Sequence, residues 1–209
     1  MKLDILIAGV GGQGTIFASR VLSSYAISKG LNVSGIETVG AAQRGGSVSS
    51  HLRISDKEIF STLIPRGSLD ILLGFEEIET LRHMKLAKRS TVYIMNQFRV
   101  PTAHTMMGID RYPDSTEVLD AARRVCARGY VLRASEKAEK LGNVQSTNLV
   151  MIGALTKVEP FFAQDGVRKY INELSGKLAA ANAKAFDEGC SSEMRLVEHI
   201  ITKENESPE

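Results

Sequence analysis

The chain has 209 residues, 43% of them hydrophobic, and a formal net charge of +2 from nearly balanced acids and bases. This length suits one α/β domain, and the balanced charge argues against a nucleic-acid partner or a membrane-surface patch. No apolar run approaches the roughly 20 residues that span a bilayer, and two cysteines, Cys126 and Cys190, are too few for an iron–sulfur cluster, which usually needs four thiolates. We therefore expect a cytoplasmic protein in a reducing compartment.

The first predicted element is a buried strand that runs into a glycine-rich turn and a helix. Leu3–Ala8 is a nearly continuous apolar run, typical of a central strand. Gly9, Gly11 and Gly14 follow it with the G-x-G-x-x-G spacing. A helical pattern then covers Thr15–Lys29. Such glycines either permit a tight turn and close helix packing or bring backbone N–H groups to a phosphate, and the spacing leaves both open.

A second strand is predicted at Leu31–Ile36, followed by Glu37. Dinucleotide-binding folds place an acid for the ribose at roughly this position, and an ordinary loop carboxylate is the alternative. An irregular glycine-rich loop follows, with Gln43 and Arg44 inside it. The planar Arg44 guanidinium suits a carboxylate or a phosphate.

Alternating polarity predicts a further strand at Val48–Ser55. We expect it to form an antiparallel hairpin with Glu58–Ile64, which would make the sheet mixed. The same alternation puts His51 on the polar face of the strand, as a hydrogen-bonding residue without a catalytic role.

The rest of the chain alternates strands and helices before it becomes helical. Strands are predicted at Asp70–Gly74, Thr91–Met95 and Tyr130–Arg133, and helices at Glu76–Met84, Asp114–Arg128, Ser135–Leu141, Val144–Leu155, Gln164–Leu174 and Lys177–Phe186. This order predicts a three-layer α/β/α domain over residues 1–190, with a mostly parallel, Rossmann-like sheet that the hairpin makes mixed, and a helical C-terminal third. For residues 191–209 we expect a short terminal helix and a frayed tail.

Several loops follow predicted strands and should meet at one edge of the sheet. They are the glycine turn, Glu37 with the loop at residues 43–47, Phe75-Glu76, and Asn96-Gln97. Ligands of open α/β sheets bind outside the carboxyl ends of the strands. The sequence therefore predicts a single functional edge.

Three stretches together resemble a known family. They are GVGGQG at Gly9–Gly14, AQRGGSVSSHLRI at Ala42–Ile54, and LIPRGSLDILLGFEEIETLR at Leu63–Arg82. They are similar to the gamma-subunit family of the 2-oxoacid:ferredoxin oxidoreductases, and the Gln-Arg-Gly-Gly sequence at residues 43–46 resembles the small (beta) subunits of its indolepyruvate branch.

The resemblance implies an accessory subunit of a heteromeric enzyme that forms acyl-CoA, CO₂ and reduced ferredoxin. Thiamine diphosphate and iron–sulfur clusters are expected on a large partner subunit, with coenzyme A as co-substrate and ferredoxin as electron acceptor. No cofactor is expected on this chain alone, and no residue is given a proton-transfer role. The residues expected to dock the large subunit and shape the approach of coenzyme A or substrate are Gly9, Gly11, Gly12, Gln13, Gly14, Gln43, Arg44, Gly45 and Gly46.

Two other functions remain open from the sequence. A free-standing NAD(P)-binding dehydrogenase would use the glycine turn and Glu37, and Tyr25 and Lys29 have the Tyr-x-x-x-Lys spacing of some dehydrogenases, although two residues four apart on a helix are common by chance. A purely structural interaction domain would use the glycines for packing alone.

Overall fold

The computed structural model describes residues 1–40 and 45–198, with the backbone alone of residue 103. These residues form a seven-stranded sheet in the order β2-β3-β1-β4-β5-β6-β7. The strands are β1 (Lys2–Val10), β2 (Asn32–Val39), β3 (Ser47–Ser55), β4 (Leu69–Gly74), β5 (Ala87–Asn96), β6 (Arg128–Leu132) and β7 (Arg195–Glu198). β1, β2, β4, β5 and β6 point one way, whereas β3 and β7 run against them.

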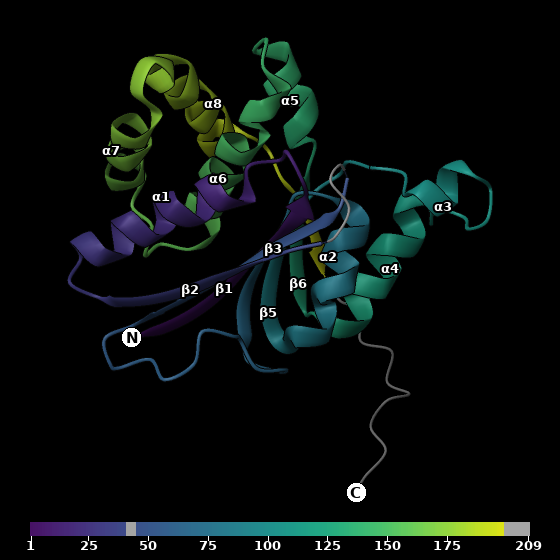
Figure 1. Cartoon of the computed structure of the whole chain (residues 1–209), viewed down its shortest axis with the longest axis horizontal. Coiled ribbons are helices and arrows are strands. Elements are labelled where there is room, and N and C mark those ends of the chain that lie inside the picture. The colour runs from purple at the N-terminus through teal and green to yellow at the C-terminus, as the bar shows by residue number, and fades with distance from the viewer. Residues whose placement is uncertain (41–44, 199–209) are drawn as a thin grey trace, which may run out of the picture.

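Helices cover both faces of this sheet (Figure 1). One face carries α1 (Thr15–Ser28), α5 (Ala134–Lys140), α6 (Thr147–Val158), α7 (Gln164–Ser175) and α8 (Ala179–Ser191), and the other carries α2 (Glu77–His83) and α4 (Ser115–Val125). The short α3 (Ala103–Met106) projects beyond α4 (Figure 1), and the 3-10 turns η1 (Met84–Leu86), η2 (Val144–Ser146) and η3 (Gly176–Leu178) link neighbouring elements. No helix within residues 1–40 and 45–198 is both long and apolar enough to cross a membrane.

The central strand β1 is buried on both faces. Ile5 and Ile7 belong to the hydrophobic cluster under α1 and α6, whereas Leu6 and Ala8 belong to the cluster under α4. All four side chains are fully buried. Because successive strand residues point to opposite faces, a strand covered on both sides reads as a continuous apolar run. The predicted three-layer α/β/α fold, its mixed sheet and its helical C-terminal third are confirmed.

The predicted hairpin between Val48–Ser55 and Glu58–Ile64 is wrong, and the antiparallel hairpin that makes the sheet mixed is formed instead by β2 and β3. β3 pairs with β2 on one side and with β1 on the other, and residues 58–64 form no strand. Arg53 accounts for part of this difference, because its Nη1 donates to the backbone oxygens of Ser61 (3.0 Å) and Leu63 (3.4 Å). These carbonyl groups therefore bond to a side chain and not to a neighbouring strand.

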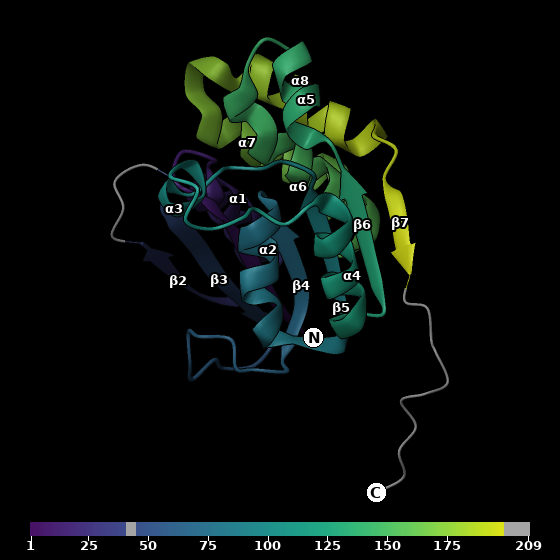
Figure 2. The same cartoon turned by 90° about the vertical axis from the view of Figure 1, so that its right-hand side faces the viewer.

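The short terminal helix predicted within residues 191–209 is wrong for the part of that range that the structure describes. Arg195–Glu198 forms β7, which pairs antiparallel with β6. Val197 pairs with Gly129 and is buried (Figure 2 shows β7 beside β6). A strand here satisfies backbone groups of β6 that would otherwise form an open sheet edge. Residues 199–209 lie outside the described chain.

Candidate functional site

The glycine turn, Phe75-Glu76 and Asn96-Gln97 lie at one edge of the sheet, as predicted, whereas Glu37 lies within β2 and not in a loop. β1, β4, β5 and β6 are parallel neighbours, so their carboxyl ends lie along one edge. The β2–β3 connection reaches the same edge, because Ser47 at the start of β3 is paired with Val10 at the end of β1. We call this the carboxyl edge.

The glycine turn places the start of α1 against the start of α6. Gly14 is the residue before α1 and has φ 76° and ψ 30°, a left-handed conformation that favours glycine. A Cβ there would lie 2.2 Å from Nδ2 of Asn148, which instead donates to the Gly14 carbonyl at 3.3 Å. Among the described residues, no side chain caps α1. Its first-turn N–H groups are of the kind that bind anions.

A cavity of about 370 Å³, lined by both polar and apolar residues, lies beside these two helix starts. Gly12 and Gly14 line it from the glycine turn, Ser146 and Asn148 from the start of α6, and Asn182 from α8. Both helix starts carry the positive end of a helix dipole. The cavity is therefore suited to an anionic group.

The Gln13 side chain stabilises the glycine turn through two hydrogen bonds. Its Oε1 accepts a hydrogen bond from the Val10 amide (2.8 Å), and its Nε2 donates to the Phe75 carbonyl (3.2 Å). The side chain therefore holds the end of β1 to the residue that follows β4. Both ends of the Gln13 amide are used by the protein itself, so its part in the site is to position the turn.

A backbone bond joins the two glycine-rich loops that the sequence singled out. The Gly11 amide donates to the Gly46 carbonyl at 2.9 Å, and Gly45 has a positive φ of 68°. The hydroxyl of Ser47 donates to Oε2 of Glu79 on α2. Gly9, Gly11, Gly12, Gln13, Gly14, Gly45 and Gly46 thus form one continuous group. The remaining predicted residues, Gln43 and Arg44, lie outside the described residues.

A second polar network continues along the carboxyl edge from the same Phe75 carbonyl. Nδ2 of Asn96 donates to that carbonyl (3.0 Å) and to the Ser135 hydroxyl (2.8 Å). Thr147 at the start of α6 lies 3.3 Å from the same hydroxyl. Asn96 is fully buried. The network ties the ends of β4 and β5 to the starts of α5 and α6.

The carboxylates at the start of α2 are buried, which the sequence did not reveal, although Phe75-Glu76 was predicted to lie at this edge. Glu76, Glu77 and Glu79 are each 5% exposed or less. Glu76 accepts from the Tyr112 hydroxyl and from the amides of Glu79 and Val100, and burial raises its pKa. The available signal was three acids in four residues directly after a buried strand, where exposed positions are usual.

Arg99 and Ser115 donate hydrogen bonds to the carboxylate of Glu77. Nε of Arg99 donates to Oε2 of Glu77 at 3.1 Å, and the Ser115 hydroxyl donates to Oε1 at 2.9 Å. A buried charge is tolerated where it is paired and hydrogen-bonded in this way. Glu76 and Glu77 therefore hold both ends of the segment between β5 and α4.

His51 is buried, contrary to the prediction that it lies on a polar face. It is 8% exposed, and its Nδ1 accepts from the Ile64 amide at 3.2 Å. The ring is therefore unprotonated at Nδ1, and burial, with the nearby His83, lowers its pKa. Both faces of β3 are covered, which alternating polarity could not reveal.

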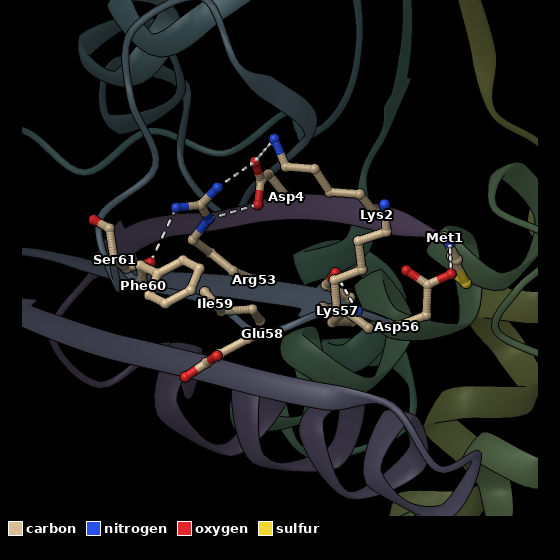
Figure 3. Close-up of a pocket in the computed structure, with 12 residues that line it drawn as sticks. Met1, Lys2, Asp4, Arg53, Asp56, Lys57, Glu58, Ile59, Phe60 and Ser61 are labelled. Atoms are coloured by element: carbon tan, nitrogen blue, oxygen red, sulfur yellow. Dashed lines mark hydrogen bonds and ion pairs between the residues drawn. The ribbon is translucent and has the colours of Figure 1, made fainter.

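A larger cavity, of about 570 Å³, lies at the opposite end of β1 and β3 (Figure 3). Arg53 and Asp4 form a two-point ion pair there, with 2.8 Å from Nε to Oδ1 and 3.2 Å from Nη2 to Oδ2. Lys2 Nζ lies 3.2 Å from Asp4 Oδ2. These charged groups bond to one another, and the cavity lies at the end of β1 opposite the carboxyl edge.

The described residues contain no group of three or more His, Cys, Asp or Glu that could hold a metal ion. Cys126 is buried, with its Sγ 3.6 Å from Sδ of Met84, and burial raises the pKa of its thiol to about 11. Such a thiol is unreactive at neutral pH. Cys126 thus fills the core, as expected for a small buried hydrophobe.

The geometry argues against the dehydrogenase alternative. Glu37 pairs with Ser50, which pairs with Ile7 of β1, so β3 lies between the predicted ribose acid and the glycine strand. Tyr25 is buried, and its hydroxyl accepts from the Ala163 amide at 3.2 Å. Lys29 lies over the Tyr25 ring, 5.2 Å from its centre. These two residues support packing at the far end of α1.

Comparison with known proteins identifies the family. The family model described as pyruvate ferredoxin/flavodoxin oxidoreductase matches residues 4–192. The indolepyruvate oxidoreductase subunit IorB of Archaeoglobus fulgidus is 37% identical over 191 residues, covering 90% of this chain and 94% of that protein. IorB of Pyrococcus horikoshii is 32% identical over 199 residues, covering 94% of this chain and 98% of that protein.

Solved structures share the fold. The pyruvate oxidoreductase subunit PORC of Thermotoga maritima matches with a TM-score of 0.69 and 20% identity, covering 94% of this chain and 99% of that chain. The 2-oxoglutarate:ferredoxin oxidoreductase of Magnetococcus marinus matches with a TM-score of 0.71 and 22% identity over 91% of this chain, which spans 30% of that longer chain. The resemblance drawn from the glycine-rich motifs is confirmed: the chain belongs to the pyruvate ferredoxin/flavodoxin oxidoreductase family, as a gamma-type subunit of a 2-oxoacid:ferredoxin oxidoreductase.

Proposed function

We propose that this chain is the small subunit of an indolepyruvate- or arylpyruvate-type 2-oxoacid:ferredoxin oxidoreductase, an enzyme that forms acyl-CoA, CO₂ and reduced ferredoxin. The observation that carries the proposal is the level of similarity. Four IorB subunits are 29–37% identical to this chain over about nine-tenths of its length. The common gamma subunits of pyruvate and ketoisovalerate enzymes are 26% identical over a similar length.

The large partner subunit supplies the thiamine diphosphate and the iron–sulfur clusters in this proposal. Two cysteines cannot provide the four thiolates that a cluster usually needs. Thiamine diphosphate carries the carbanion chemistry when bound, and the clusters carry the electrons to ferredoxin. This chain's contribution is to bind and orient, and we place the complex in the cytoplasm.

The carboxyl edge is the surface that we assign to this task. Its two glycine-rich loops are joined by the bond between Gly11 and Gly46, and Gln13 fixes the first of them. The cavity beside the starts of α1 and α6 has the chemistry to receive an anionic part of coenzyme A. We propose that this edge docks the large subunit and borders the approach of coenzyme A or the 2-oxoacid, with Gln43 and Arg44 as side-chain donors.

Replacing Arg44 with alanine in the reconstituted two-subunit enzyme tests this role. We expect kcat/KM for acyl-CoA formation to fall about ten- to a hundredfold while the complex still assembles, because a charge-assisted hydrogen bond is lost. Arg66→Ala is the matched control, since this exposed arginine lies in the turn before β4, at the other end of the sheet, and it should leave the rate unchanged.

Two results would change this assignment. If Arg44→Ala abolishes assembly and the remaining complex is fully active, the loop is only an interaction surface. If the variant equals the wild type in assembly and rate, Arg44 has no part in the site. Gel filtration with the large subunit and a steady-state assay separate these outcomes.

A further inference from the structure

Ser47 connects the carboxyl edge to a buried carboxylate on the opposite helix layer. Its hydroxyl donates to Oε2 of Glu79 on α2. Glu79 is 5% exposed, and its Oε1 forms an ion pair with Nε of Arg82 at 3.2 Å, where the Arg82 side chain is 53% exposed. The bond joins a half-buried hydroxyl to a buried carboxylate, and hydrogen bonds to an ionised acceptor are stronger than those between neutral groups.

Ser47 lies where the two glycine-rich loops meet, so its bond to Glu79 can fix their relative position. Ser47 is paired with Val10, the residue at which β1 ends, and its carbonyl accepts from the Gly40 amide at 2.7 Å. Its neighbour Gly46 accepts from the Gly11 amide. Glu79 therefore acts at the point where the second loop returns to the sheet and touches the first.

A glycine-rich loop needs contacts with other parts of the protein to hold it in one conformation. Gly45 and Gly46 have no side chains to pack, and glycine loses more conformational freedom on ordering than any other residue. Gly45 also has a positive φ, which few other residues adopt at low cost. Because the Glu79 carboxylate holds the Ser47 hydroxyl in one place, it restricts the conformations of the adjoining loop.

We infer that Glu79 is a positioning residue, which acts through Ser47 to set the glycine loop at residues 45–46 against Gly11 for the reaction of the assembled enzyme. This inference rests on the proposed function of the carboxyl edge. Glu79 contacts neither substrate nor cofactor in this assignment. It fixes the geometry from which the edge works, and small displacements of a positioned group are costly in rate.

Ser47→Ala is the first test, in the complex of full-length subunits at saturating small subunit. We expect kcat/KM for acyl-CoA formation to fall roughly tenfold. Glu79→Ala should give the same loss, and the double variant should lose no more than either single variant, because both remove one interaction. Glu79→Gln keeps an oxygen acceptor for the Ser47 hydroxyl, so it should restore the rate to within about twofold of the wild type.

Thr91→Val is a matched control. It also removes a hydroxyl that holds two parts of the chain together, since Oγ1 of Thr91 is buried and donates to the Leu69 carbonyl at 2.6 Å, but this bond lies toward the amino ends of β4 and β5 and not at the carboxyl edge. We expect its kcat/KM to equal that of the wild type, with a similar change in melting temperature to Ser47→Ala.

Three outcomes would overturn the assignment. They are a wild-type rate for Ser47→Ala, equal rate losses for Ser47→Ala and Thr91→Val, and failure of Glu79→Gln to restore the rate of a folded, assembled complex. A lower melting temperature of Glu79→Ala with unchanged kcat/KM would likewise make Glu79 purely structural. If the wild-type chain itself supports no acyl-CoA formation with its large subunit, the proposed function fails first, and that result is recognisable before any variant is compared.

Discussion

Gln13 illustrates at the residue scale what a motif predicts and what it leaves out. The spacing of Gly9, Gly11 and Gly14 predicted a tight turn between a strand and a helix, and the turn is there. The role of Gln13 could not be predicted, because its second partner, the Phe75 carbonyl, is 62 positions away in the sequence. Side-chain bonds between distant loops depend on the packed fold, which local patterns do not contain.

Two buried histidines make stability depend on pH in a defined direction. Burial lowers the pKa of both His51 and His83 below the usual value of about 6.5. Above that pH both rings are neutral in the folded and the unfolded chain. As the pH falls below about 6.5, the unfolded chain binds protons that the folded chain does not, so the free energy of unfolding decreases.

Replacing His83 should weaken this dependence. His83→Gln removes one of the two titrating rings while keeping a donor for the Glu79 carbonyl, which lies 2.9 Å from Nδ1 of His83. We expect a smaller decrease in the free energy of unfolding between about pH 6.5 and 5.5, measured by urea titration. An unchanged slope would show that His83 does not titrate as described. Glu76, whose pKa is raised by burial, contributes a slope of the opposite sign above its ordinary value of 4.5, and this contribution is common to the wild type and the variant.

At the scale of elements, the strongly patterned strands and helices were predictable and the edges of the sheet were not. β1, β4 and β5 are covered by helices on both faces, and their apolar runs stand out in the sequence. Residues 58–64 were predicted as a strand, yet Arg53 donates hydrogen bonds to two of their carbonyl groups. β7 has only four residues, and its pairing with β6 depends on where the helical C-terminal third ends.

The crossing of α6 and α8 gives a prediction at this scale. A Cβ at Gly153 would lie 2.3 Å from the Phe186 carbonyl oxygen, and one at Gly189 would lie 2.1 Å from the Val150 carbonyl oxygen. Backbone atoms of a packed helix cannot easily move aside. We expect Gly153→Ala to lower the free energy of unfolding by about 1–3 kcal/mol, measured by denaturant titration.

The test of this prediction is whether Gly153→Ala lowers or raises the free energy of unfolding. Glycine to alanine in a helix normally stabilises by about 1 kcal/mol, and Ala181→Gly at an exposed position of α8 calibrates that effect in this protein. A stabilised Gly153→Ala variant would mean that the two helices do not approach as closely as described. The double variant with Gly189→Ala should be less than additive, since both residues serve one crossing.

At the scale of the whole molecule, the fold and the shared edge of its loops followed from the order of the elements. Parallel strands put the glycine turn, Phe75 and Asn96 on one edge, and the sequence predicted that convergence. The burial of the α2 carboxylates was missed, because patterning treats acids as surface residues. The proposed division of labour between subunits rests on the resemblance and not on any local pattern.

The central claim is that this chain works only as part of a larger enzyme. The most direct measurement is ferredoxin reduction with indolepyruvate and coenzyme A, assayed for the purified chain alone, for the large subunit alone and for an equimolar mixture. We predict no turnover by this chain alone and full turnover by the mixture, with acyl-CoA and CO₂ as products. Turnover of a 2-oxoacid by the purified chain without a partner, or a mixture no more active than the large subunit by itself, would contradict the account.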